Sequence, residues 1–183
     1  MKSAISLPKS RQESVASITS TCDGSLSDKW ILYYHLPNDK KWDLDSYKII
    51  MKDIDNLDKL IILNKTLTEK IVKNCMLFVM KNKITPMWED PKNRKGGCFS
   101  FKVINKFAAD VWKNVFFALC GETLFINRQH HKLVNGITIS PKKNFCILKI
   151  WLENCSLQDV SLIESIPNLY KPGALFKAHS PEF

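Results

Sequence analysis

Short runs of aromatic and branched residues, separated by polar or glycine-rich segments, recur along most of the chain. Runs of this length and composition between turn residues are typical of β-strands. The predicted strands are Trp30–His35, Tyr47–Met51, Met76–Met80, Cys98–Val103, Gly136–Ser140, Phe145–Trp151 and Ala174–Ala178. The fifth and sixth of these flank the polar segment Pro141–Asn144, so we expect them to form a hairpin.

Three other segments carry helical signals. Apolar residues recur at helical spacing over about Asp55–Asn64, which predicts a helix there. The clearest pattern covers Lys106–Cys120, where one face is apolar and a glycine follows as a stop signal. Ser156 and Asp159 have the spacing of an N-cap pair and predict a third helix over about 156–165.

The order of these elements favours an α+β fold. Strands and helices both occur, but they do not alternate strictly as they do in parallel βαβ folds. We therefore expect a mostly antiparallel sheet with about three helices packed on one face. Residues 1–27 are rich in Ser and Thr and poor in aromatic residues, which predicts a flexible tail followed by one folded domain over residues 28–183.

The composition is that of a globular protein with an excess of positive charge. Of the 183 residues, 45% are hydrophobic, and the formal net charge is +9. A basic domain favours an anionic partner such as nucleic acid or phosphate, although solubility alone would also explain the charge. The six cysteines include no Cys-x-x-Cys pair, so we expect reduced thiols and no metal or redox motif. No apolar run reaches the ~20 residues of a membrane span, and no apolar signal core is present, so we expect no membrane association and no secretion.

One segment carries a more specific signal. Thr85–Gly97 reads Thr-Pro-Met-Trp-Glu-Asp-Pro-Lys-Asn-Arg-Lys-Gly-Gly. A Met-Trp-Glu-Asp sequence before a basic Gly-Gly turn resembles the eukaryotic translation initiation factor 4E family, whose members bind the cap of messenger RNA. The resemblance extends from about Leu26 to the C-terminus. The five tryptophans fall where that family places tryptophans, at Trp30, Trp42, Trp88, Trp112 and Trp151.

The resemblance implies a fold and a biological setting. The sheet would be curved, with the helices on its convex face. The protein would be a monomeric, non-enzymatic translation initiation factor of the cytoplasm, or of the host cytoplasm if the source is viral. Its ligand would be the 7-methylguanosine cap of mRNA, with no cofactor. It would recruit capped mRNA for translation or, as a repressor, sequester it.

The residue types at this motif suit recognition of a methylated guanine. Methylation at N7 makes guanine a cation, and two parallel indoles can hold such a ring by stacking and cation–π attraction. By the resemblance, Trp42 and Trp88 are the two plates, and Trp151 contacts the N7-methyl group. Ionised Glu89 is a hydrogen-bond acceptor, so it can accept from both N1–H and N2–H of guanine. Adenine offers no such pair of donors.

The cap triphosphate requires cations, and here the sequence departs from the family pattern. On a gapless alignment, Lys142 takes the position of a phosphate-binding Arg of the family, whereas Ile147 takes that of a phosphate-binding Lys. Lys143 in the same turn and Lys149 on the following strand are the expected substitutes. Lysine is a point charge rather than a bidentate fork, so we expect looser phosphate binding. His179 is expected to border the second nucleotide, with an exposed tail histidine as the alternative.

The resemblance also implies a second functional face, where scaffold factor 4G and the 4E-binding proteins dock a helix. We place the altered partner face at Ile54, Asp58 and Lys113. At Asp58 and Lys113, charged residues stand where the family has exposed apolar anchors, and burying an unpaired charge costs several kcal/mol. We therefore expect the usual partners to bind weakly or not at all. Either a replacement partner of complementary charge exists, or the protein works without a scaffold.

Two alternatives to methyl-selective cap binding remain open at this point. The domain could keep the fold but have lost methyl-cap selectivity, and contact RNA or protein through its basic surface. An enzyme is disfavoured, because the sequence has no Gly-rich phosphate loop, no Ser-His-Asp or Cys-His arrangement and no carboxylate cluster at metal-ligand spacing. His130 and His131 are interpreted as solvated residues of a polar loop.

Overall fold

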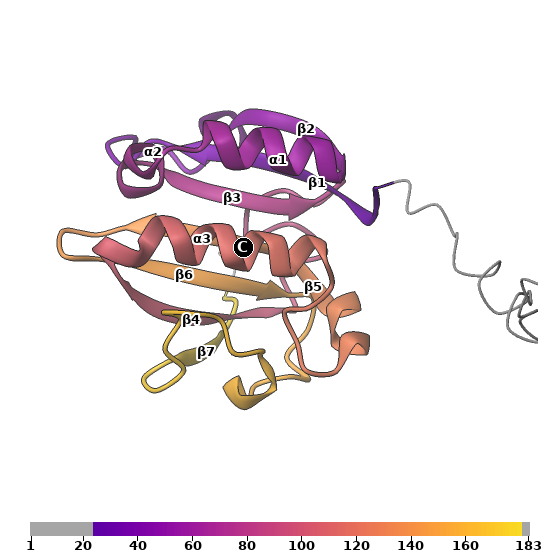
Figure 1. Ribbon diagram of the computed structural model, residues 1–183. Coiled ribbons are helices and arrows are strands. Elements are labelled where there is room, and N and C mark those ends of the chain that lie inside the picture. The colour runs from indigo at the N-terminus through magenta and orange to yellow at the C-terminus, as the bar shows by residue number, and fades with distance from the viewer. Residues whose placement is uncertain (1–23, 181–183) are drawn as a thin grey trace, which may run out of the picture.

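The aromatic and branched runs of the sequence form a seven-stranded antiparallel sheet in the computed structural model, which describes residues 24–180. The strands are β1 (Ser25–His35), β2 (Lys48–Asn56), β3 (Met76–Lys81), β4 (Gly97–Ile104), β5 (Val134–Pro141), β6 (Phe145–Leu152) and β7 (Leu175–Ala178). Their order across the sheet is β2-β1-β3-β5-β6-β4-β7, and every pair of neighbours is antiparallel. All seven predicted strands are confirmed, and the sheet is curved (Figure 1).

Three α-helices within residues 24–180 cover one face of this sheet (Figure 1). They are α1 (Leu57–Thr66), α2 (Glu69–Asn74) and α3 (Ala108–Cys120). Side chains just before the first two helices cap them, because Asn56 accepts a hydrogen bond from the Lys59 amide and Thr68 accepts one from the Ile71 amide. The expected α+β fold, an antiparallel sheet with helices on its convex face, is confirmed.

Side-chain alternation along the strands gives the sheet two different faces. Leu77 and Val79 of β3 belong to the main hydrophobic core, together with Trp112 of α3. Phe78, which lies between them, belongs instead to a second and smaller apolar cluster that includes Trp151. This second cluster lies on the face that the α-helices leave uncovered, and it supports the site described below.

The helix predicted over 156–165 is wrong. That segment forms only a 3-10 turn over Val160–Leu162, which the Asp159 side chain caps. Ile163 is fully buried and forms a β-bridge with Phe125. The bridge holds the chain extended, so a tertiary contact overrides the local capping signal.

Two predicted boundaries also differ from the structure. β1 begins at Ser25, inside the predicted tail, and residues 1–23 of that tail lie outside the described residues. β2 continues to Asn56, so the first helix begins at Leu57 rather than at Asp55. Both differences have one cause, since Ser25 pairs with Asn56 at the end of a long β1–β2 ladder.

Burial corrects two further expectations. Ile54 is fully buried in the main core, so its expected place on an exposed partner face is wrong. His131 is 3% exposed and is not a solvated loop residue.

The cysteines of the described segment are free thiols, of which three, Cys98, Cys120 and Cys146, are buried. No helix within residues 24–180 combines the length and the apolar character needed to cross a membrane.

Candidate functional site

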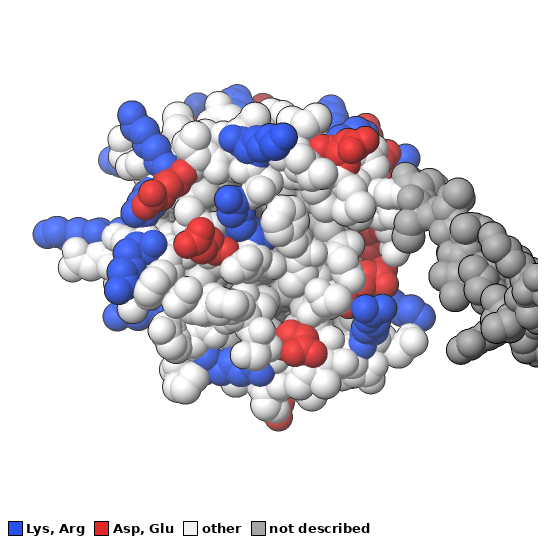
Figure 2. Space-filling view, in the orientation of Figure 1, with Lys and Arg blue, Asp and Glu red and all other residues white. Residues whose placement is uncertain are grey.

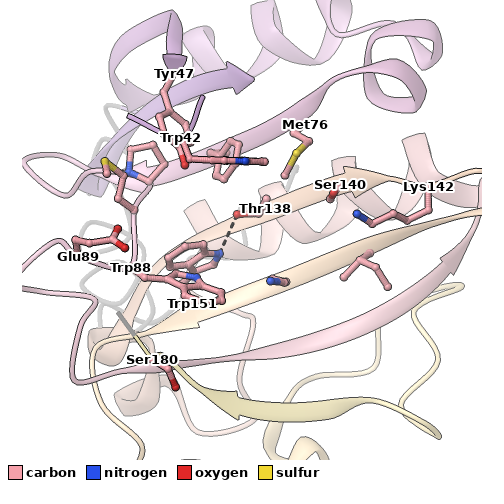
Figure 3. Close-up of a pocket in the computed structure, with 15 residues that line it drawn as sticks. Trp42, Tyr47, Met76, Trp88, Glu89, Thr138, Ser140, Lys142, Trp151 and Ser180 are labelled. Carbon is pink, nitrogen blue, oxygen red and sulfur yellow. Dashed lines mark hydrogen bonds between the residues drawn. The ribbon is translucent and has the colours of Figure 1, made fainter. Parts of the chain in front are cut away.

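A cavity opens on the sheet face opposite the α-helices. Its volume is about 780 Å³, within the size range of small-molecule sites. The loop after β1, the loop between β3 and β4, and strands β3, β5 and β6 contribute its walls. The lining residues are Trp42, Tyr47, Met76, Phe78, Pro86, Met87, Trp88, Glu89, Thr138, Ser140, Lys142, Ile147, Lys149, Trp151 and Ser180. Figure 3 shows Trp42 and Tyr47 on one side of the cavity and Trp88 and Trp151 on the other.

Trp42 is presented by a loop that hydrogen bonds hold in place. Its indole is 52% exposed and stacks on the imidazole of His35, with 4.2 Å between the ring centroids and an interplanar angle of 2°. His35 is fully buried and donates from Nε2 to the carbonyl oxygen of Lys41 at 2.8 Å. Asp43 accepts a hydrogen bond from the Ser46 amide at 3.0 Å, which starts a 3-10 turn. His35 thus supports one face of Trp42 and leaves the other face for the cavity.

Trp88 and Glu89 lie on a loop that buried polar side chains hold from within. Asp90 accepts hydrogen bonds from the amide and the hydroxyl of Thr85, at 2.7 and 2.8 Å. Asn93 donates to two loop carbonyl oxygens, including that of Thr85 at 2.9 Å. Asp90 and Asn93 are both buried, so these bonds are shielded from water. The motif therefore stabilises its own turn and leaves Trp88 and Glu89 to face the cavity.

The two glycines that follow allow this loop to close against the neighbouring strands. A Cβ atom at Gly96 would lie 1.9 Å from the carbonyl oxygen of Leu152. A Cβ atom at Gly97 would lie 2.5 Å from the ring of Phe176. Any larger residue would therefore collide with β6 or β7, which explains the Gly-Gly pair after the basic turn.

A second imidazole supports Trp88. The His179 ring stacks on the Trp88 indole, with 5.7 Å between centroids and an angle of 13°, and it donates from Nδ1 to the carbonyl oxygen of Asn93 at 2.7 Å. Burial lowers the pKa of His179, so the ring is neutral at neutral pH. His179 is 8% exposed and does not line the cavity. The expected contact with a second nucleotide is therefore corrected, and so is the alternative of an exposed tail histidine.

Tyr47 is a site residue that the sequence analysis did not identify. Its ring lies 5.3 Å from that of His35 and 6.3 Å from that of Trp42. Burial raises the pKa of Tyr47 to about 12, and the charges of Glu89 and Asp43 contribute to the shift. The phenol is therefore uncharged at neutral pH. The one sequence signal for it was an aromatic residue at the start of a predicted strand.

Trp151 forms part of the wall beside Trp88. Its indole is 3% exposed, and Nε1 donates to the Thr138 hydroxyl of β5 at 2.8 Å (Figure 3). This bond fixes the ring across the β5–β6 pairing. The structure thus brings Trp42, Trp88, Glu89 and Trp151 to one cavity, although they come from three distant parts of the chain.

Lysines supply positive charge away from Glu89. Lys142 and Lys149 line the cavity, and Figure 3 shows Lys142 at the opposite end from Glu89. The Lys149 ammonium lies 5.6 Å from the centroid of the Trp88 ring, within the range of a cation–π contact. Lys143 is exposed on the β5–β6 turn and does not line the cavity. Two of the three expected phosphate-binding lysines therefore reach the site.

This combination of side chains suits a particular class of ligand. Exposed indole surface binds a flat aromatic ring, most strongly a cationic one. A carboxylate at one end accepts hydrogen bonds from the edge of that ring, and ammonium groups at the other end attract an anionic tail. Glu89 is the one carboxylate among the lining residues, and no candidate metal-ligand group among residues 24–180 includes a residue of this cavity.

Comparison with known sequences identifies relatives of this chain. The family model described as Eukaryotic initiation factor 4E matches residues 25–177. The chain is 42% identical over 63 residues to the eukaryotic translation initiation factor 4E homolog of Acanthamoeba polyphaga mimivirus, which covers 34% of this chain and 23% of that protein. It is 26% identical over 145 residues to the eukaryotic translation initiation factor 4E of Candida glabrata, which covers 75% of this chain and 67% of that protein.

Solved structures show the same fold. Caenorhabditis elegans initiation factor 4E-3, in complex with the 4E-binding protein Mextli and a cap analogue, superimposes with a TM-score of 0.63 at 21% identity, over 72% of this chain and 75% of that chain. Ascaris suum initiation factor 4E-3 with an m7G cap superimposes with a TM-score of 0.63 at 21% identity, over 75% of this chain and 78% of that chain.

Proposed function

The chain belongs to the eukaryotic initiation factor 4E family, and on that basis we propose that it binds the 7-methylguanosine cap of mRNA in translation initiation. One observation carries the proposal: Trp42 and Trp88 line the same cavity from opposite sides, with Glu89 at one end and Lys142 at the other. The cap has the matching parts, because it joins a flat cationic base to a triphosphate.

The base would be bound by stacking and read at its edge. Methylated guanine would lie between the Trp42 and Trp88 indoles, where stacking on an aromatic ring contributes about 1–3 kcal/mol per base. Glu89 would accept hydrogen bonds from N1–H and N2–H, and Trp151 would contact the N7-methyl group. His35 and His179 each stack on one of the two indoles, so both plates are held in place before the ligand arrives. Such preorganisation reduces the entropy lost on binding.

The proposed role of the protein is binding rather than catalysis, and its proposed setting is the cytoplasm. Its alternative is a module that has kept the fold and lost selectivity for the methylated cap. The presence of Trp42, Trp88 and Glu89 in one cavity favours cap binding over this alternative. A repressor that sequesters capped mRNA would use the same cavity, so its distinction from an initiation factor lies in the partners.

A tryptophan-fluorescence titration with 7-methyl-GTP, with GTP in parallel, tests the proposal. Stacking of a cationic base between Trp42 and Trp88 should quench the emission, and 7-methyl-GTP should quench strongly where GTP quenches little. An equal response to both nucleotides would support the module without methyl selectivity. No response to either would contradict cap binding altogether.

Replacing Lys142 or Lys149 with alanine should weaken 7-methyl-GTP binding by about five- to tenfold each, since each variant loses one charge-assisted contact to phosphate. Affinity for 7-methylguanosine, which carries no phosphate, should stay unchanged. Isothermal titration calorimetry of both ligands measures the difference. Lys143→Ala is the matched control, because Lys143 lies in the same hairpin outside the cavity. An equal loss of nucleoside affinity would show that these lysines do not act through the phosphates.

We further infer that the helix-bearing face docks partners differently from other family members. Asp58 is exposed in the first turn of α1, and Lys113 is half-buried on α3. Apolar residues of α1 nevertheless remain exposed, including Ile61 and Ile62 at 48% and 51%. Figure 2 shows this face, with uncharged surface over much of its middle and charged side chains mainly around it. An apolar helix could still pack here, but it would meet a charge at two anchor positions.

A peptide carrying the helix of a 4E-binding protein should therefore bind weakly to this chain. Lys113→Leu should strengthen binding by at least about tenfold, because an ammonium that loses its water on docking opposes the contact. Fluorescence anisotropy with a labelled peptide measures both affinities, and Lys132→Leu, an exposed lysine outside the α-helices, controls for charge alone. Tight binding to the unmodified chain would contradict the inference.

A further inference from the structure

A polar cluster lies at the C-terminal end of α3, outside the cavity described above. It joins Asp28 of β1, Glu122 just after α3, and His131 of the 3-10 turn over Arg128–Leu133. One ligand atom from each side chain lies within 4.8 Å of the other two. None of the three residues lines the cavity, so the function proposed above leaves the cluster unexplained.

His131 is the unusual member of this cluster. Its ring is 3% exposed and packs edge-on against Trp30, with 6.2 Å between centroids. Neither ring nitrogen has a hydrogen-bond partner among residues 24–180. A buried polar atom without a partner is costly and requires an explanation.

One distance inside the cluster is that of two metal ligands rather than that of a hydrogen bond. His131 Nε2 lies 3.6 Å from Asp28 Oδ2, which is too long for a hydrogen bond. Bond lengths of about 2.0–2.2 Å to nitrogen and oxygen place two ligands of a tetrahedral zinc ion about 3.3–3.6 Å apart. The two atoms therefore stand at the separation that a shared ion would give them.

The local charge permits a cation. Asp28 and Glu122 contribute two negative charges. Among residues 24–180, the one positive group paired with the cluster is Lys81, whose Nζ lies 3.0 Å from Asp28 Oδ2. A dication would compete with Lys81 for Asp28. The Lys81 ammonium is also 5.8 Å from the Trp30 ring centroid. That contact with the indole would remain when Asp28 binds the ion.

We propose that Asp28, Glu122 and His131 bind a zinc ion, with water completing the coordination. One imidazole and two carboxylates form a ligand set that zinc accepts, and it is poor in the oxygen atoms that calcium requires. The ion would tie the start of β1, the end of α3 and the following 3-10 turn together. Its role would be structural, since the cluster is separate from the cap-binding cavity. The spacing in the sequence carries no sign of it, because three distant segments each supply one ligand.

Isothermal titration of the metal-stripped full chain with Zn²⁺ tests the proposal. We expect one saturable site and a rise in the melting temperature on zinc addition, because a ligand that binds the folded state stabilises it. Glu122→Gln and Asp28→Asn preserve side-chain shape and should each weaken zinc binding at least tenfold. Glu69→Gln, at an exposed carboxylate of α2, is the matched control and should bind zinc as the unmodified chain does.

Cobalt substitution separates this site from zinc bound by cysteines. Co²⁺ held by nitrogen and oxygen ligands should lack the intense near-ultraviolet band of a cobalt thiolate. A thiolate band, the absence of a saturable site, or equal zinc affinity in the Glu122→Gln and Glu69→Gln variants would each overturn the proposal. The cobalt measurement uses the unmodified chain, so it does not depend on whether a variant folds. Cap binding can fail its own test without affecting any of these results.

Discussion

Trp88→Ala should weaken binding of 7-methyl-GTP by about 10- to 100-fold, because it removes one of the two stacking surfaces and the associated cation–π attraction. Fluorescence is a poor reporter for this variant, so calorimetry with 7-methyl-GTP is the appropriate measurement.

Trp88→Phe serves as the control for this substitution. A phenyl ring keeps an aromatic face at the same position, so the variant should retain most of the affinity. Circular dichroism of Trp88→Ala should match that of the unmodified chain, since Trp88 lies at the edge of the smaller apolar cluster rather than in the main core. An alanine variant that bound within twofold of the unmodified chain would remove Trp88 from the site.

The second large effect is expected for Glu89→Gln. The carboxylate accepts hydrogen bonds in the proposed complex, and a hydrogen bond to a charged group contributes about 1.5–3 kcal/mol. Glutamine replaces one acceptor oxygen with an NH₂ group that would face a guanine N–H. We therefore expect at least about a tenfold loss of 7-methyl-GTP affinity by calorimetry, since about 1.4 kcal/mol corresponds to one factor of ten.

Tyr47 provides a check on Glu89→Gln that needs no ligand. The negative charge of Glu89 contributes to the raised pKa of Tyr47, so its removal should lower that pKa from about 12 towards the ordinary value for tyrosine. Ultraviolet titration of tyrosinate measures the shift. Glu69→Gln, an exposed carboxylate on α2, is the control and should change neither the affinity nor this titration. An unchanged cap affinity in Glu89→Gln would exclude Glu89 as the group that reads the guanine edge.

The strands and α3 were predictable because their signals are local. Aromatic and branched runs between turn residues specify strands, and the apolar stripe over Lys106–Cys120 specifies a helix whatever it packs against. The helix predicted over 156–165 failed for the opposite reason. The conformation of this segment depends on the pairing of Ile163 with Phe125. Phe125 is too far along the chain for the residues around 160 to reveal that contact.

The site residues were predictable where they lie together in one short segment of the sequence. Trp88 and Glu89 are neighbours in a motif whose other polar residues, Asp90 and Asn93, stabilise the turn that presents them. The supports behind the two indoles were not predictable. His35 and His179 gain their roles from stacking on rings that lie elsewhere along the chain, and composition or periodicity does not encode such contacts.

Residue types and local periodicity therefore specified the α+β elements, the excess of positive charge and the stacking and hydrogen-bonding groups of the motif. Packing specified which of those groups meet. In the tertiary structure Lys142 and Lys149 line the cavity, Lys143 lies outside it, and Ile54 is buried. The physical reason is that a strand or helix pattern depends on neighbours a few residues apart, whereas a site depends on distances between side chains that the fold alone brings together.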